Sequence, residues 1–206
     1  MKRVHLPEKQ YAGYIFDLDG TRVDSMPLHY KAWRMALHKA GAPYEAFLPR
    51  EFYACGGKSA CDVVKFINSK YGVEMDAEAV SEDKRAIYLD LLANEGVVPI
   101  VETVDFVRSL GANAPVAIAT GSMMAGASMT LKSAGIDDLF SLVVTPEDVE
   151  HGKPAPDMFL LAAEKLGVKS ADCVVFEDAE PGILAANAAG MDCIVVETPE
   201  EYFEQV

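Results

Sequence analysis

Short apolar runs alternate with helical patterns along most of this chain, and the alternation restricts the folds open to it. Strands are predicted at five apolar runs, residues 14–16, 116–119, 142–144, 174–176 and 194–196. Helices are predicted between the last four of these runs, at residues 123–134, 156–166 and 181–189, and a glycine follows each helix as a stop signal. Buried strands that alternate with helices form a parallel sheet with helices on both faces. We therefore predict an α/β fold with a Rossmann-like parallel sheet core.

The region after the first strand departs from this alternation. Helical patterns are expected at residues 28–40, 59–71 and 77–94, and no convincing strand comes before Gly96. The sequence thus predicts an all-helical cap domain at residues 25–95, inserted into a core domain made of residues 1–24 and 96–206. Substrates of open α/β sheets bind outside the carboxyl ends of the strands, so an insertion that leaves this edge would cover the site.

Composition excludes several classes of partner. The 206 residues carry a formal net charge of -14 and contain no block of Lys or Arg, which argues against nucleic acid and anionic membrane surfaces as partners. We find no apolar segment long enough to span a bilayer and no apolar signal-peptide core in the first ten residues. The four cysteines show no C-x-x-C spacing, so a reducing, cytoplasmic location is expected.

The first predicted strand ends in two aspartates, Asp17 and Asp19, which lie on the same side of the extended chain. Ordinary turn chemistry explains Asp19 followed by Gly20 but does not explain Asp17. Two carboxylates this close together are destabilising unless a cation lies between them. The sequence therefore predicts a cationic partner for this pair.

Polar residues also follow the other predicted strands. Thr120, Gly121 and Ser122 open onto a helix N-terminus, where backbone N–H groups favour an anion. Lys153 lies in the proline-stiffened loop HGKPAPD, and the pair at 177–178, Glu-Asp, follows the fourth strand. Taken singly, these could be a helix cap, a solvated lysine and acidic residues that favour a helix N-terminus.

In a parallel sheet, however, these strand ends converge on one edge. Asp17, the backbone carbonyl of Asp19 and Asp178 then form a hard-oxygen site suited to Mg²⁺, and Lys153 adds a second positive charge. The convergence supplies the cations that the aspartate pair requires.

Four motifs resemble the haloacid dehalogenase superfamily of phosphotransferases, in the branch with a helical cap after the first motif. These are DLDGT at residues 17–21, ATGS at 119–122, GKPAPD at 152–157 and FEDAEPGILAANAAGM at 176–191. Within the superfamily, the chain looks most like the group of β-phosphoglucomutases and small sugar-phosphate phosphatases, fructose-1-phosphate phosphatase-like proteins among them. The stretches HYKAWRMAL, HGKPAPDMFLLAAEKLGV and FEDAEPGILAANAAGM carry this closer likeness.

The resemblance implies a role for each matched residue. Asp17 would be the nucleophile that becomes an aspartyl phosphate, and Asp19 the general acid and then the general base. The phosphoryl group would be held by Lys153 and by the segment Thr120, Gly121 and Ser122. Mg²⁺ would be bound by Asp17, Asp19 and Asp178, with Glu177 as a further ligand or as a residue that orients one.

Three positions depart from the family pattern. Arg22 replaces the usual aliphatic residue at the hinge to the cap, where it would reach a substrate phosphate or be solvated. Ala179 replaces a serine that many relatives carry. In the loop CGGKSACDVV, which resembles the family's substrate-specificity loop, Lys58 lies in a region where mutases often have an arginine.

These features predict a Mg²⁺-dependent phosphatase of a small phosphorylated sugar or related metabolite. The alternative is a β-phosphoglucomutase that uses the same Asp17 and Asp19; His29, at the start of the cap, occurs in both kinds of enzyme. A catalytically inactive binding protein is not expected because both aspartates are present. A dehalogenase is not expected either, since Asp19, Gly20 and Thr21 match the phosphotransferase form of the first motif.

Overall fold

The structure of this chain is a computed structural model that describes residues 2–43, 45–56, 59–111 and 114–199. It divides into two compact units. The described residues of the first unit lie within Met1–Ser25 and Val97–Pro199, and those of the second lie within Met26–Gly96. No helix in the described ranges is long and apolar enough to cross a membrane.

A six-stranded sheet forms the centre of the first unit, with the strand order β1-β6-β5-β2-β3-β4. Its strands are β1 (Arg3–Val4), β2 (Gly13–Phe16), β3 (Val116–Ala119), β4 (Val143–Val144), β5 (Cys173–Glu177) and β6 (Asp192–Glu197). β2 lies between β3 and β5 and pairs with both in parallel. Only β1 breaks the parallel pattern, because it pairs antiparallel with β6 at the edge of the sheet.

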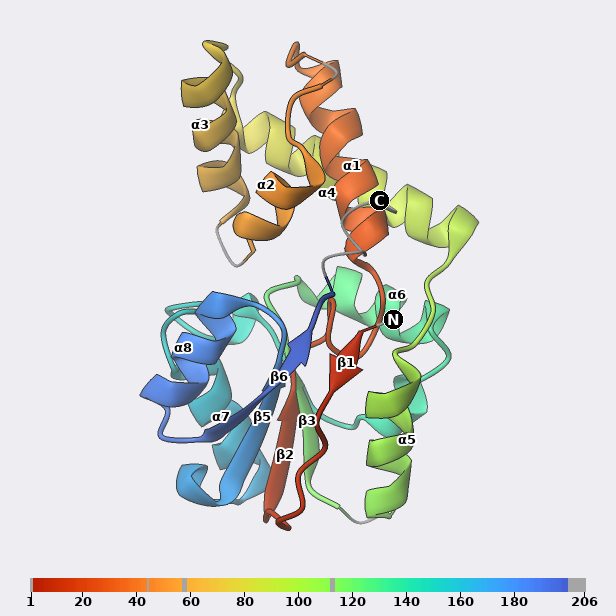
Figure 1. The fold of residues 1–206 in the computed structure, drawn as a ribbon, viewed down its shortest axis with the longest axis vertical. Coiled ribbons are helices and arrows are strands. Elements are labelled where there is room, and N and C mark those ends of the chain that lie inside the picture. Colours follow the sequence, from red (N-terminus) through yellow and green to blue (C-terminus); the bar gives the residue numbers. More distant parts are fainter. Residues whose placement is uncertain (1, 44, 57–58, 112–113, 200–206) are drawn as a thin grey trace. The chain divides into compact units, whose positions relative to one another are not determined.

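Helices cover both faces of this sheet because alternate strand residues point to opposite sides. Ile15, Ala117 and Val175 pack with apolar residues of α7 (Asp157–Leu166) and α8 (Glu180–Ala188). Phe16 and its neighbours in the adjacent strands instead pack with α5 (Val101–Leu110) and α6 (Met124–Ser133). Figure 1 shows these two pairs of helices on opposite sides of the sheet. The predicted α/β class, with a parallel core covered on both faces, is confirmed.

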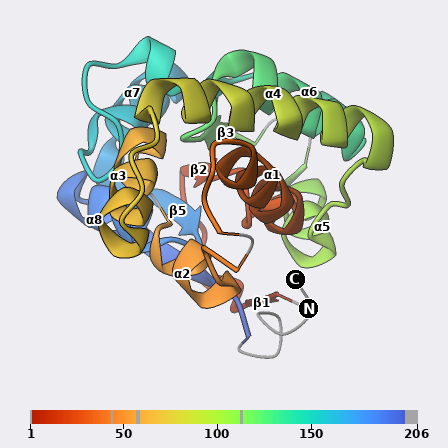
Figure 2. The same ribbon diagram turned by 90° about the horizontal axis from the view of Figure 1, so that it is seen from above.

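The second unit is helical in its described residues. It contains α1 (Met26–Lys39), α2 (Pro49–Ala54), α3 (Ala60–Tyr71) and α4 (Ala77–Glu95), which are seen from above in Figure 2. α1 and α4 pack together, and ion pairs join them, with Lys31 2.5 Å from Glu95 and Lys39 2.8 Å from Asp83. An aromatic and aliphatic core that includes Trp33, Phe47 and Ile67 holds the unit together. The role of this unit as a cap stays a prediction.

The predicted helices are present with small shifts at their ends, the largest being at α1, which begins at Met26 instead of residue 28. One strand and two α-helices of the described residues were not predicted. β1 has two residues and α2 has six, so neither is long enough to show a period. α5 follows Pro99 and begins without a side-chain cap at Ile100, so it lacks the usual start signal.

Arg22 lies inside the core of the first unit. Its side chain is fully buried, and its guanidinium carbon lies 4.8 Å from the Phe16 ring centre and 4.9 Å from that of Phe140. None of its three guanidinium nitrogens has a hydrogen-bond partner among the described residues. Burial, with a smaller contribution from Arg108, lowers the pKa of Arg22 to about 9. The expectation of a solvated side chain is therefore wrong.

Replacing Arg22 should stabilise the protein. We expect Arg22→Met to raise the free energy of unfolding by about 1–3 kcal/mol, because a buried charge without hydrogen bonds costs more than the two ring contacts return. Thermal and urea unfolding would measure the change. Arg85→Met, at an exposed position on α4, is the control and should change stability by less than about 0.5 kcal/mol. Lower stability of Arg22→Met would show that the two aromatic rings hold the guanidinium favourably.

Candidate active site

The carboxyl ends of β2, β3 and β5 bring the predicted polar residues to one edge of the sheet. Phe16 of β2 is in register with Ile118 of β3 and with Phe176 of β5, so the residues that follow each strand lie side by side. The backbone N–H of Asp17 donates to the carbonyl of Phe176 at 2.9 Å, which extends the pairing by one residue. The register of the strands, and not a loop, therefore sets the spacing between the carboxylates of Asp17 and Glu177.

Lys153 joins two of these carboxylates. Its Nζ lies 2.6 Å from Asp17 Oδ1 and 2.7 Å from Glu177 Oε1, and all three side chains are at least nine-tenths buried. The ammonium also lies 5.0 Å from the centre of the Phe159 ring on α7. The predicted cationic partner of Asp17 is thus Lys153. The solvated-lysine alternative is wrong, since this ammonium is buried.

Burial dominates the electrostatics of Asp17 and Lys153. It raises the pKa of Asp17 well above its usual range; Lys153 opposes this effect, and Glu177, Asp178 and Asp19 add to it. Burial alone would lower the pKa of Lys153, but the charges of Asp17 and Glu177 outweigh it and raise that pKa. Lys153 is therefore held as an ammonium, and one ammonium does not offset all the negative charge around Asp17.

Asp19 has different neighbours. Its Oδ1 accepts a hydrogen bond from Ser25 Oγ at 2.6 Å, and its Oδ2 accepts one from Ser122 Oγ, also at 2.6 Å. The backbone N–H of Ser122 in turn donates to Thr120 Oγ1 at 3.1 Å. Two hydroxyl groups therefore orient the Asp19 carboxyl. Ser25 was not predicted as a site residue, because a serine two residues before a proline gives no signal of its own.

Asp178 is fixed from both sides. Its Oδ1 accepts from Thr21 Oγ1 at 3.2 Å, and its Oδ2 accepts from Lys2 Nζ at 3.0 Å. Burial raises the pKa of Asp178, and the Lys2 charge opposes this effect. A Cβ atom on Gly20, whose φ is +89°, would lie 2.1 Å from Asp178 Oδ2. The carboxylate thus occupies the space that the missing side chain of Gly20 leaves.

Glu177 is engaged by protein groups at both carboxylate oxygens. Oε1 pairs with Lys153, and Oε2 accepts from the backbone N–H of Ala179 at 2.7 Å. The residue is 2% exposed, and its side chain fills the space beside Gly182, which has no side chain to interfere. This geometry favours a residue that orients Lys153 over a metal ligand.

The donor set fits a divalent cation. Asp17, Asp19, Glu177 and Asp178 bring four carboxylates to this edge, whereas Lys2 and Lys153 bring two ammonium groups. No three Asp, Glu, His or Cys side chains of the described residues form a ready-made metal cluster. Mg²⁺, however, is usually held by one or two carboxylates together with water and substrate phosphate. Asp17, Asp178 and the Asp19 carbonyl would meet that requirement.

Three further residues were predicted as substrate contacts. Arg22 packs in the core, as described above. His29, in the second unit, stacks on Tyr88 with ring centres 3.9 Å apart, and its Nδ1 lies 2.8 Å from Lys84 Nζ. Lys58 falls outside the described residues.

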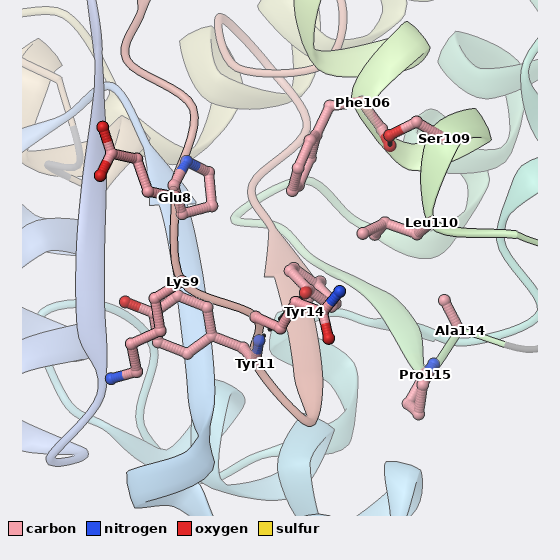
Figure 3. Close-up of a pocket in the computed structure, with 11 residues that line it drawn as sticks. Glu8, Lys9, Tyr11, Tyr14, Phe106, Ser109, Leu110, Ala114 and Pro115 are labelled. Atoms are coloured by element: carbon pink, nitrogen blue, oxygen red, sulfur yellow. Dashed lines mark hydrogen bonds between the residues drawn. The ribbon is translucent and has the colours of Figure 1, made fainter.

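A cavity of about 470 Å³ lies at the opposite end of the sheet, beside the starts of β2 and β3. Figure 3 shows Tyr14, Phe106 and Leu110 among the residues that line it. Tyr14 Oη accepts from the backbone N–H of Tyr11 at 3.0 Å, while the Tyr11 hydroxyl and Lys9 both bond to Asp192. None of the residues that line the cavity is a predicted catalytic residue.

Comparison with known proteins agrees with this fold. The family profile of the haloacid dehalogenase-like hydrolases matches residues 11–190. Fructose-1-phosphate phosphatase YqaB of Escherichia coli K12 is 40% identical over 189 residues, which cover 91% of this chain and 97% of that protein. Hexitol phosphatase A of the same organism is 33% identical, with 92% and 84% covered.

A solved structure of β-phosphoglucomutase from Clostridium difficile superposes with a TM-score of 0.72 at 28% identity, covering 96% of this chain and 89% of that one. The chain belongs to the haloacid dehalogenase-like hydrolase family. The predicted resemblance and the predicted enzyme class, a phosphomonoester hydrolase, are both confirmed.

Gly20 offers a test of how closely Asp178 must be held. Gly20→Ala should lower phosphatase turnover by about a hundredfold or more, because the new Cβ pushes the Asp178 carboxylate from its position. Gly111→Ala is a matched control, since Gly111 has a φ of +88° but nothing within 4 Å of the position that a Cβ would take. Both variants should lose about 1–2 kcal/mol of stability from backbone strain. Equal turnover in the two variants would show that the position of Asp178 does not matter.

Proposed function

We propose that this protein is a Mg²⁺-dependent phosphatase of a small phosphorylated sugar, and that it acts through an aspartyl phosphate on Asp17. The observation that carries the proposal is the contrast between two neighbouring aspartates. Asp17 pairs with the buried ammonium of Lys153, whereas Asp19 is held by the hydroxyls of Ser25 and Ser122. Two carboxyl groups in different environments suit two different chemical roles.

Asp17 is suited to the role of nucleophile. Lys153 holds one of its oxygens and favours the ionised form, which is the form that attacks phosphorus. In the first step an Asp17 oxygen bonds to phosphorus as the bond from phosphorus to the sugar oxygen breaks. In the second step water attacks the same phosphorus, which releases inorganic phosphate and restores the Asp17 carboxylate.

Asp19 is suited to proton transfer. Neutral serine hydroxyls, which can turn from donor to acceptor, hold both of its oxygens, so the carboxyl can give a proton to the leaving sugar oxygen and later take one from the attacking water. The hydroxyl of Ser122 fixes the carboxyl relative to the β3 end. Asp19 would therefore act on the leaving group and the water in turn.

The transferring phosphoryl group would be held by Lys153 and by the segment Thr120, Gly121 and Ser122. Thr120 is 1% exposed, and nothing lies within 4 Å of the position of a Cβ on Gly121, so the backbone there is open to a ligand. Lys153, which neutralises Asp17, would then neutralise the phosphate as well. These contacts keep the phosphorus in line with Asp17.

Mg²⁺ would be held by Asp17, Asp178 and the backbone carbonyl of Asp19, with Glu177 positioned to support Lys153. When bound, the ion would neutralise the negative charge that otherwise repels the carboxylate from a phosphate dianion. The residues Thr21 and Gly20 keep Asp178 in place for it.

A sugar phosphate is favoured as substrate because the relatives named above include phosphatases of fructose 1-phosphate and of hexitol phosphates. The likeness to β-phosphoglucomutase keeps the isomerase as a second candidate, since it would use the same Asp17 and Asp19. A mutase must also bind the second phosphate of a bisphosphate, and Lys58 in the helical insertion is the proposed contact that separates the two functions.

A panel assay tests the proposed function. We expect phosphate release from sugar monophosphates, fructose 1-phosphate among them, that stops in EDTA and returns with Mg²⁺. Asp17→Asn should abolish the release while leaving the fold intact, because an amide cannot form the acyl phosphate. Glucose 1,6-bisphosphate should not accelerate any reaction of β-glucose 1-phosphate. Full activity in EDTA would contradict the metal requirement, and bisphosphate-dependent formation of glucose 6-phosphate would establish the mutase instead.

A further inference from the structure

Lys2 is the second ammonium at this edge, and its position follows from the direction of β1. Because β1 is antiparallel to β6, its first residues lie at the edge where the parallel strands end. The residue before β1 thus lies beside Thr198, which follows β6, and Lys2 Nζ is 2.5 Å from Thr198 Oγ1. From there the side chain extends to Asp178, which follows β5.

The contact between Lys2 and Asp178 is a buried one. The side chains are 2% and 7% exposed, whereas the pair of Lys9 and Asp192, at the other end of the sheet, is 64% and 59% exposed. Lysine is rarely buried unless its charge is paired. The ion pair between Lys2 and Asp178 is therefore part of the buried site, unlike an ion pair on the surface.

The pair involves a carboxylate that the proposed function assigns to Mg²⁺. Lys2 donates a hydrogen bond to Oδ2 and Thr21 donates one to Oδ1, so both oxygens of Asp178 already accept hydrogen bonds. A cation bound to Asp178 would lie close to the Lys2 ammonium, and like charges that share one carboxylate repel. Lys2 also lines a pocket of about 510 Å³ together with Asp24 and Glu102, so space for its side chain exists away from Asp178.

We propose that Lys2 is an intramolecular competitor of the metal, which neutralises Asp178 when Mg²⁺ is absent and gives way when Mg²⁺ binds. The competition presupposes the metal site of the proposed function. It couples the first strand of the sheet to occupancy of that site, because movement of Lys2 loosens the start of β1.

Calorimetric titration with Mg²⁺ alone tests the competition without relying on turnover. We expect Lys2→Met to bind Mg²⁺ of order tenfold more tightly than the wild type, since it removes a competing charge. Lys2→Arg keeps the charge and should bind as the wild type does. Lys9→Met, which removes an exposed lysine of the same segment, is the matched control and should leave the affinity unchanged.

Hydrogen exchange of the wild-type protein gives a second measurement that needs no variant. Mg²⁺ should speed amide exchange at Arg3 and Val4, whereas a general stabilisation by the ion would slow it. Equal or weaker Mg²⁺ binding by Lys2→Met, or slower exchange in β1, would overturn the role of Lys2 and leave the phosphatase intact. If neither protein binds Mg²⁺, the proposed metal site fails as well.

Discussion

The buried contact of Lys153 with Asp17 and Glu177 is the interaction on which the rest of the site depends. It gathers the ends of β2 and β5 around one ammonium, and the loop after β4 supplies that ammonium from a third direction. Without it, the buried carboxylates of Asp17, Glu177 and Asp178 would have only the Lys2 ammonium beside them. A buried ion pair of this kind adds little net stability, so its presence is better explained by function than by folding.

The charge at this edge also explains why it would bind a metal and a phosphate in turn. Four carboxylates face two ammonium groups, and burial raises the pKa of both Asp17 and Asp178. A divalent cation would relieve the repulsion among the carboxylates, and a phosphate dianion could then approach Asp17. The parallel sheet holds the charges fixed, so the repulsion persists until a ligand relieves it.

Much of this could be predicted from the sequence, because strand ends in a parallel sheet converge whatever the loops between them do. This convergence predicts that Asp17, Lys153 and Asp178 come together at one edge, and the structure brings them there. Lys2 could not be found, since its position depends on a two-residue antiparallel strand that leaves no periodic signal. Arginine is usually exposed, so the sequence predicts Arg22 in solvent or near the substrate, and only the three-dimensional packing shows its guanidinium against the rings of Phe16 and Phe140.

The central claim is that Asp17 carries the phosphoryl group, and chemical trapping tests it most directly. Asp19→Asn should still react with para-nitrophenyl phosphate, whose leaving group needs no acid, but should hydrolyse the phosphoenzyme slowly. Rapid denaturation followed by borohydride would reduce an aspartyl phosphate to homoserine, which peptide mass spectrometry locates. We expect homoserine at position 17 only when substrate and Mg²⁺ are both present. Nitrophenol release that leaves Asp17 unmodified, or a modification at another residue, would contradict the assignment.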